Sequence, residues 1–155
     1  MKSQVHTVSV SLLFLIGLVL MIIAFFWGEP ILRSSVETSS SVLAETFLKK
    51  LDSEIRSVVS YGGVAELNFE GPGILEVRPE EDLIEIKFRA TTEFPENWTY
   101  LRNSTSVLRE RKHGDMFVVQ LYYRDIDIVA SGKFALSEGV VMIRRKDGRV
   151  ELELI

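Results

Sequence analysis

The chain begins with a long apolar run. An amphipathic helical pattern follows it, and after that come short runs of alternating apolar and polar residues. From Ser3 to Gly28 no side chain carries a full charge at neutral pH. As a helix, the segment from Val8 to Trp27 would rise about 30 Å, the thickness of the hydrocarbon core of a bilayer. A secretory signal has a shorter apolar region and a small-residue cleavage site, whereas this run ends in Phe25-Phe26-Trp27. The pattern predicts a transmembrane helix.

The second period is that of an amphipathic helix. Pro30 has no N–H to donate and restricts the residue before it, so we expect a helix kink or a short break there. Apolar residues then recur at a four-then-three spacing. They are Leu43, Phe47, Leu51, Ile55 and Val58/Val59. Gly62-Gly63 predicts the helix end, because Gly readily adopts the left-handed conformation that closes a helix.

Beyond Gly63 apolar and polar residues alternate in short runs, which indicates half-buried strands. The predicted runs are 65–69, 75–77, 84–88, 105–111, 116–124, 126–131, 140–145 and 149–155. Asp147-Gly148 between the last two is a strong hairpin signal. About seven short strands in about 90 residues favour an antiparallel β-sandwich, with the immunoglobulin type as one candidate.

These patterns predict an α+β chain in three parts. Residues 1–29 would hold the N-terminal leader and the transmembrane helix. Residues 30–62 would form the kinked amphipathic helical extension, and residues 63–155 the β-sandwich domain. A chain of 155 residues has room for one modest globular unit beyond such a helix.

Composition excludes several functions. The net charge is −4 and the 18 Lys and Arg are scattered, so we expect no nucleic-acid partner. The chain has no Cys, which removes disulfides, thiolate zinc sites and thiol nucleophiles. It also lacks G-x-S-x-G, phosphate-loop and H-E-x-x-H motifs. We therefore expect no enzyme, no cofactor and no metal site.

Three charged clusters carry alternative interpretations. Asp125 with Asp127, or Glu80-Glu81-Asp82 at a turn, would be the candidates for calcium, but calcium needs six or more oxygen ligands. We interpret both clusters as solvated acidic turns or strand edges. The basic run from Arg109 to His113 is interpreted as a solvated loop, with contact to anionic lipid or polysaccharide as the alternative.

Aromatic residues raise the alternative of a carbohydrate-binding face. The candidates are Phe94, Trp98, Tyr100, Tyr122 and Tyr123. On a strand, Tyr122 and Tyr123 must point to opposite faces, so we expect one of the two in the core.

Two N-x-[ST] sequons lie close together, at Asn97-Trp98-Thr99 and Asn103-Ser104-Thr105. This pattern is the acceptor for N-glycosylation. We therefore predict N-glycosylation at Asn97 and Asn103. The prediction places the C-terminal part outside the cytoplasm.

The order of a basic residue, an apolar helix near the N-terminus, an amphipathic continuation ending in Gly-Gly and a β domain resembles the archaeal type IV pilin-like superfamily. That superfamily includes pilins, archaellins and accessory archaellum proteins. Its members carry a short leader ending in a basic and a small residue, which a prepilin peptidase removes. Lys2-Ser3 followed by Gln4 matches this pattern and implies cleavage between Ser3 and Gln4. Leu12 then falls at the ninth mature position, where many archaeal pilins carry Leu.

The resemblance implies a single-pass cell-membrane protein with an extracytoplasmic C-terminal domain, or a subunit of a surface filament. Its implied partners are the membrane, other pilin-like or envelope proteins and further copies of the chain. Val8 stands where many of those pilins carry an acidic residue, which leaves open an accessory protein that stays in the membrane. The function we expect is structural assembly through the apolar helix. The alternative is a membrane-tethered module that binds sugar or peptide.

A set of small residues in the apolar run bears on assembly. Ser9, Gly17 and Ala24 are spaced eight and seven apart, which places them on roughly one face of a helix. Small residues let helices approach closely in lipid, so we predict a helix-packing face here. Gly and Ser are also common in transmembrane helices of every kind, and this simpler interpretation stays open.

Overall fold

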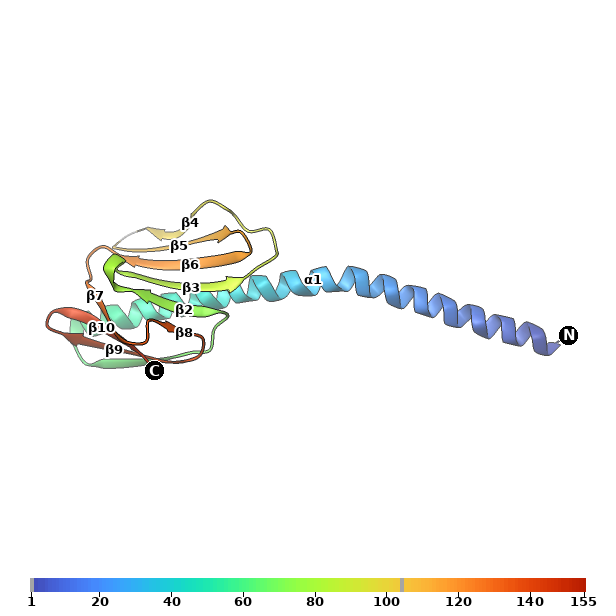
Figure 1. Ribbon diagram of the computed structural model, residues 1–155, viewed down its shortest axis with the longest axis horizontal. Helices are drawn as coiled ribbons and strands as arrows, with labels where there is room; N and C mark the ends of the chain where they lie inside the picture. The colour runs from blue at the N-terminus through green and yellow to red at the C-terminus, as the bar shows by residue number, and fades with distance from the viewer. Residues whose placement is uncertain (1, 104) are drawn as a thin grey trace. The chain divides into compact units, whose positions relative to one another are not determined.

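The computed structural model describes residues 2–103 and 105–155, and the side chains of residues 12–102 and 105–155 (Figure 1). One long helix, α1 (Lys2–Tyr61), precedes a β-rich region. The strands are β1 (Val64–Phe69), β2 (Ile74–Arg78), β3 (Leu83–Arg89), β4 (Thr99–Asn103), β5 (Ser106–His113), β6 (Met116–Tyr123), β7 (Ile128–Gly132), β8 (Ala135–Leu136), β9 (Gly139–Lys146) and β10 (Arg149–Leu154). A 3₁₀ turn, η1 (Pro79–Glu81), joins β2 to β3. The chain is therefore of the α+β class.

The chain divides into two compact units, Met1–Val36 and Glu37–Ile155. The first unit is entirely helical over its described residues. Helix α1 continues through Pro30 as one element, and a kink there remains a prediction. The second unit contains the rest of α1 and all the strands named above.

The second half of α1 is helical because one of its faces is buried in the core of the second unit. The buried residues are Ala44, Leu48, Leu51, Ile55 and Val58. This corrects the predicted stripe at its start, since Leu43 is 58 % exposed and Phe47 is only partly buried. At about 100° per residue, Leu43 lies about 80° around the helix from Leu51, whereas Ala44 lies within about 20° of it. Residues spaced four apart therefore turn gradually away from the buried face, and this is why Leu43 lies outside it.

The helix ends where the glycine pair predicted. Gly62 has φ of 75°, the left-handed conformation, and its N–H donates to the carbonyl oxygen of Val58 at 2.9 Å. A residue with a side chain adopts this conformation only at a cost, so Gly62 suits the helix end. The turn then directs the chain into β1.

The strands form two sheets. Sheet A has the order β1-β9-β10-β7, and sheet B has the order β4-β5-β6-β3-β2-β8. Neighbouring strands are antiparallel except for β10 and β7, which are parallel. The predicted Asp147-Gly148 hairpin joins β9 to β10, and in it Arg149 lies opposite Lys146. Neither the parallel pair nor the short strand β4 was predicted from the sequence.

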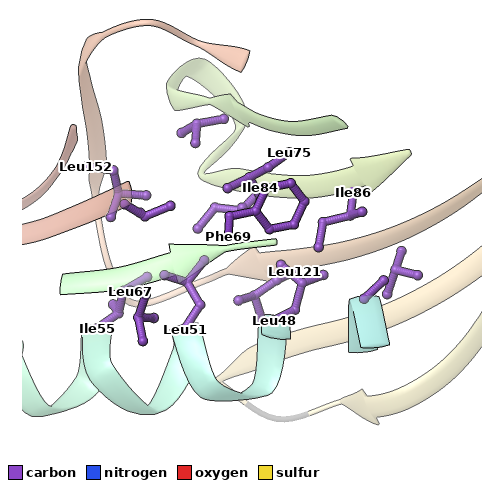
Figure 2. Packing of buried hydrophobic residues seen from close by; sticks show 14 of the residues in the cluster. Leu48, Leu51, Ile55, Leu67, Phe69, Leu75, Ile84, Ile86, Leu121 and Leu152 are labelled. Carbon is purple, nitrogen blue, oxygen red and sulfur yellow. The ribbon is translucent and has the colours of Figure 1, made fainter. Parts of the chain in front are cut away.

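The core of the second unit lies where α1 and strands of both sheets meet (Figure 2). Phe69 of β1 is fully buried, and its ring contacts the ring of Phe47 on α1 edge-on, with centroids 4.9 Å apart. Figure 2 shows Leu48, Leu51 and Ile55 projecting from the helix towards the strand side chains. The helix therefore contributes one wall of the core that sheets A and B share.

Candidate functional site

The first unit exposes an apolar surface, which we call the apolar segment (residues 12–32). Every large apolar side chain in it is at least 45 % exposed. Its helix is long and apolar enough to cross a membrane, with a mean hydropathy of 2.4 over 18 residues. Exposing so large an apolar surface to water is unfavourable, because the free energy falls when apolar surface is transferred out of water. The segment therefore suits lipid or the apolar faces of other helices.

The predicted packing face of the apolar segment is open at its centre. A Cβ added at Gly17 would meet nothing within 4 Å. Ala24 follows two turns later on the same helix. The side chains of Ser9 and of the predicted cleavage residues Ser3 and Gln4 lie outside the described residues. The helix-packing role of these small residues stays a prediction.

A row of polar side chains crosses the face of sheet B that points away from the core. In register across the strands, Glu76 of β2 pairs with Glu85 of β3, Glu85 with Gln120 of β6, Gln120 with Arg109 of β5, and Arg109 with Tyr100 of β4. Directly paired residues on one face of an antiparallel sheet have adjacent side chains. We call these five residues the polar row.

Hydrogen bonds connect most of the polar row. The Arg109 Nε donates to the Gln120 Oε1 at 3.1 Å, and the Gln120 Nε2 donates to the Glu85 Oε2 at 2.8 Å. Glu85 and Gln120 are buried, at 1 % and 8 % exposed. A buried carboxylate is tolerated when it is paired and hydrogen-bonded. These contacts fix the position of Arg109.

Two cations complete the charge balance at the β2–β3 end of the polar row. The Lys87 Nζ lies 2.7 Å from the Glu76 Oε2 and 2.6 Å from the Glu85 Oε1, and the Arg78 Nη2 lies 2.8 Å from the Glu85 Oε1. The hydrogen bond from Lys87 lowers the pKa of Glu76. Burial alone would lower the pKa of Lys87, but hydrogen bonds to Glu76 and Glu85 outweigh it and raise that pKa. At this end of the row, Glu76 and Glu85 are therefore both paired with cations.

At the other end of the row, two arginines of β5 share one indole ring. The guanidinium carbons of Arg109 and Arg111 lie 4.1 and 4.3 Å from the ring centroid of Trp98. A cation over an aromatic face is attracted by the ring quadrupole. Trp98 therefore contacts both guanidinium groups.

A hollow lies beside this cluster. It is lined by Glu80, Glu81, Asp82, Leu83, Arg109 and Tyr122. Leu83 and Tyr122 are paired across β3 and β6, and the acidic residues come from η1 and the residue after it. The hollow thus has an apolar and aromatic floor, a basic side and an acidic side.

The structure separates the aromatic residues that the sequence grouped. Tyr123 is 1 % exposed and belongs to the core, and Phe94 packs on the buried Phe117 with centroids 4.2 Å apart. Tyr122 is 37 % exposed on the opposite face, so the predicted division between Tyr122 and Tyr123 is confirmed. Tyr100, at 54 % exposed, and Trp98 lie with Tyr122 along sheet B.

The basic run from Arg109 to His113 is part of strand β5, so its interpretation as a solvated loop is wrong. Because side chains alternate between the two faces of β5, Glu110 points to the side of α1. There the Glu110 Oε2 accepts a hydrogen bond from the hydroxyl of Ser41 at 3.5 Å. Burial and the nearby carboxylate of Glu45 raise the pKa of Glu110. Glu110 therefore does not neutralise Arg109 and Arg111.

The acidic clusters have structural contacts. The Asp82 Oδ1 accepts a hydrogen bond from the backbone N–H of Ile128 at 2.9 Å, Asp125 pairs with Arg56 at 3.5 Å, and Asp127 pairs with Arg149 at 2.8 Å. Among the residues that the structure describes, no three His, Cys, Asp or Glu side chains come together as a metal site.

The two sequons lie around β4. Asn97 is exposed in the loop before it, whereas the side chain of Asn103 lies outside the described residues.

Sequence reasoning missed a carboxylate clamp at the start of the second unit. Glu37 on α1 is 8 % exposed and accepts four hydrogen bonds from the loop after β3. The Thr91 N and Oγ1 donate at 3.0 and 2.8 Å, the Thr92 N donates at 2.6 Å, and the Thr92 hydroxyl also donates. Burial would raise the pKa of Glu37, but these hydrogen bonds lower it to about 2. A lone Glu in a Ser- and Thr-rich stretch carries no signal of such a role.

Replacing Glu37 with Gln is expected to lower the free energy of unfolding at pH 7 by about 1.5–3 kcal/mol, because hydrogen bonds to a charged acceptor are lost. The folded pKa of about 2 lies below the ordinary value of 4.5. This stabilisation is therefore complete above about pH 4.5 and is lost as the pH falls towards 2. Urea unfolding at several pH values measures it. Glu54→Gln makes the same change at a half-exposed position of α1 and should leave the profile unaltered. Equal profiles for the two variants would contradict the clamp.

A second buried cluster also escaped sequence reasoning. Asp52 on α1 is 2 % exposed and pairs through its Oδ2 with Arg102 of β4, and its Oδ1 lies 3.3 Å from the Arg56 Nε. The Arg102 Nη2 also lies 2.5 Å from the Ser106 Oγ. Burial and the Asp52 charge raise the pKa of Tyr123. The cluster joins the helix to the edge strand of sheet B.

Comparisons with protein-family models, with curated proteins and with solved structures each found no match for this chain.

Proposed function

We propose that this protein is a structural subunit of an archaeal cell envelope, pilin-like or archaellum-accessory in kind, that assembles through its apolar helix. The apolar segment carries the proposal. In the second unit, large apolar side chains fill a core, whereas between residues 12 and 32 every such side chain is at least 45 % exposed. Lipid or neighbouring helices are the environments in which such a surface is stable. The mechanism is assembly rather than catalysis.

The second unit suits presentation outside the membrane. In the proposed arrangement the helix stays in the finished protein, either in the membrane or in a filament core, and the β domain is extracytoplasmic. Asn97 is exposed, as a glycan acceptor requires. The two sheets would act as an antiparallel-rich sandwich, with the immunoglobulin type as the candidate, that contacts the envelope layer or neighbouring subunits.

Replacing Gly17 with Leu is expected to weaken association between the helices about tenfold. The added side chain occupies the face on which close approach is proposed, and helix contacts of this kind contribute about 1–2 kcal/mol. Cross-linking in native membranes, followed by quantitative co-purification, measures the effect. Val19→Leu adds bulk about 200° around the helix and serves as the control. Unchanged assembly in Gly17→Leu would remove the packing face from the proposal.

Processing and sidedness need a separate measurement. Intact mass and N-terminal sequencing of the protein from its native membrane should show a start at Gln4 and added hexose mass at Asn97 or Asn103. A start at Met1 with no added mass would contradict pilin-like processing and leave a plain anchor. A start beyond Trp27 would contradict the whole proposal.

A further inference from the structure

We propose that the outer face of sheet B binds a saccharide that carries a carboxylate, an acidic sugar of the uronic-acid class. The site, called here the Arg–Trp site, consists of Arg109 and Arg111 beside Trp98 together with the neighbouring hollow over Leu83 and Tyr122. This inference goes beyond the proposed assembly role and does not depend on it.

The first argument is charge. Arg78 and Lys87 lie on the same face of sheet B and pair with Glu76 and Glu85 at 2.6 to 3.1 Å. Within the described part of the chain, by contrast, neither Arg109 nor Arg111 has a carboxylate within 4.0 Å. Their guanidinium groups therefore keep an uncompensated positive charge, and a guanidinium fork binds a carboxylate through two parallel hydrogen bonds.

The second argument is preorganisation. Arg109 is held by Gln120 through its Nε and by the ring of Trp98, which leaves its two terminal nitrogens for a ligand. The Arg111 Nε is buried and has no hydrogen-bond partner among the described residues. Because that Nε is shielded from solvent, the terminal nitrogens of Arg111 are the ones left for a ligand oxygen. Groups that are already fixed lose little conformational entropy on binding.

The third argument is the hollow beside Arg109. Its floor includes Tyr122, whose side chain is 37 % exposed and offers an aromatic surface for the face of a sugar ring. Glu80 and Glu81 on the opposite side are exposed, and their side-chain oxygens can accept hydrogen bonds from sugar hydroxyls. A ligand with a carboxylate at one end and hydroxyl donors at the other matches this arrangement. A uniformly anionic lipid surface would be repelled by the acidic side.

The test uses the full chain in nanodiscs of phosphatidylcholine. Isothermal titration with a galactose tetramer that ends in one galacturonate, called here the acidic tetramer, should show saturable binding, and a neutral galactose tetramer should bind at least about tenfold more weakly. Arg109→Gln should weaken binding of the acidic tetramer about tenfold or more, because a charge-assisted bidentate pair is lost. Arg89→Gln is the matched control, since Arg89 is an 85 % exposed cation of β3 in the same sheet. It should change the affinity less than about twofold.

Tyr122→Ala tests the floor of the hollow without removing a charge, and it should weaken binding while Arg89→Gln does not. Folding of each variant is checked by the circular dichroism spectrum. Absence of binding by the wild-type chain, or equal weakening by Arg109→Gln and Arg89→Gln, would overturn the proposal. Binding to vesicles containing phosphatidylglycerol without binding to the acidic tetramer would overturn it in favour of a lipid site. None of these results bears on assembly through the apolar segment.

Discussion

Replacing Leu51 with Ala is expected to lower the free energy of unfolding of the second unit by about 2–5 kcal/mol. Leu51 is fully buried on the core face of α1. Removing its three outer carbons loses their transfer free energy and leaves a cavity, because the surrounding helix and strands relax only in part. Both losses act on the contact between α1 and the sheets.

The measurement uses the two tryptophans of the chain, Trp27 and Trp98. A Trp27→Phe background leaves Trp98 as the only tryptophan, which is excited selectively over tyrosine at long wavelength, and it lies in the second unit. Urea unfolding in mild detergent then follows that unit alone. The matched control is Leu43→Ala, the same chemical change on the same helix at a residue that is 58 % exposed. It should cost less than about 1 kcal/mol. Similar losses for the two variants would contradict the buried face that the structure assigns to the helix.

Replacing Asp52 with Ala is the second large expected effect, a loss of about 1.5–3 kcal/mol in the free energy of unfolding, because hydrogen bonds to a buried charged acceptor are lost. The change removes the carboxylate that Arg102 and Arg56 share, so Arg102 loses its carboxylate partner and Arg56 keeps only the exposed Asp125. Breaking one side of a buried ion pair costs more than replacing both sides with apolar groups. The double variant Asp52→Leu with Arg102→Met should therefore recover much of the loss.

The control for the Asp52 experiment is Asp125→Ala. Asp125 pairs with the same Arg56 at 3.5 Å, but its side chain is 42 % exposed. An exposed ion pair contributes about 0–1 kcal/mol, so this variant should unfold almost as the wild type does. If the Asp52 and Asp125 variants lost equal stability, or the double variant were weaker than Asp52→Ala, burial of the pair would not be the cause.

Predictions from sequence were most accurate where a single period controls burial. Leu51, Ile55 and Val58 were predicted to face the core and do so, and Gly62 ends the helix. Leu43 was placed on the buried face because an apolar residue every four positions resembles a stripe. On a helix of 3.6 residues per turn such a row turns away from the core.

The candidate sites were less predictable because they depend on which strands become neighbours. The alternation of β3 indicates that Glu85 points away from the core, and it does, but the side chains of Arg78, Lys87 and Gln120 bury it there. Trp98 was recognised as part of a sequon and as an aromatic candidate. Its contact with Arg109 and Arg111 requires the pairing of β4 with β5, and β4 was not predicted from the sequence.

The sequence by itself determined the long apolar helix, the amphipathic continuation, the Gly62 helix end and most of the strands. These follow from local composition and period, which act within a few residues. Only the tertiary structure decided the parallel pairing of β7 with β10, the burial of Glu37 and Asp52, and the meeting of Trp98 with two arginines. Such contacts join residues far apart in the chain, and their free energy depends on neighbours that no local pattern specifies.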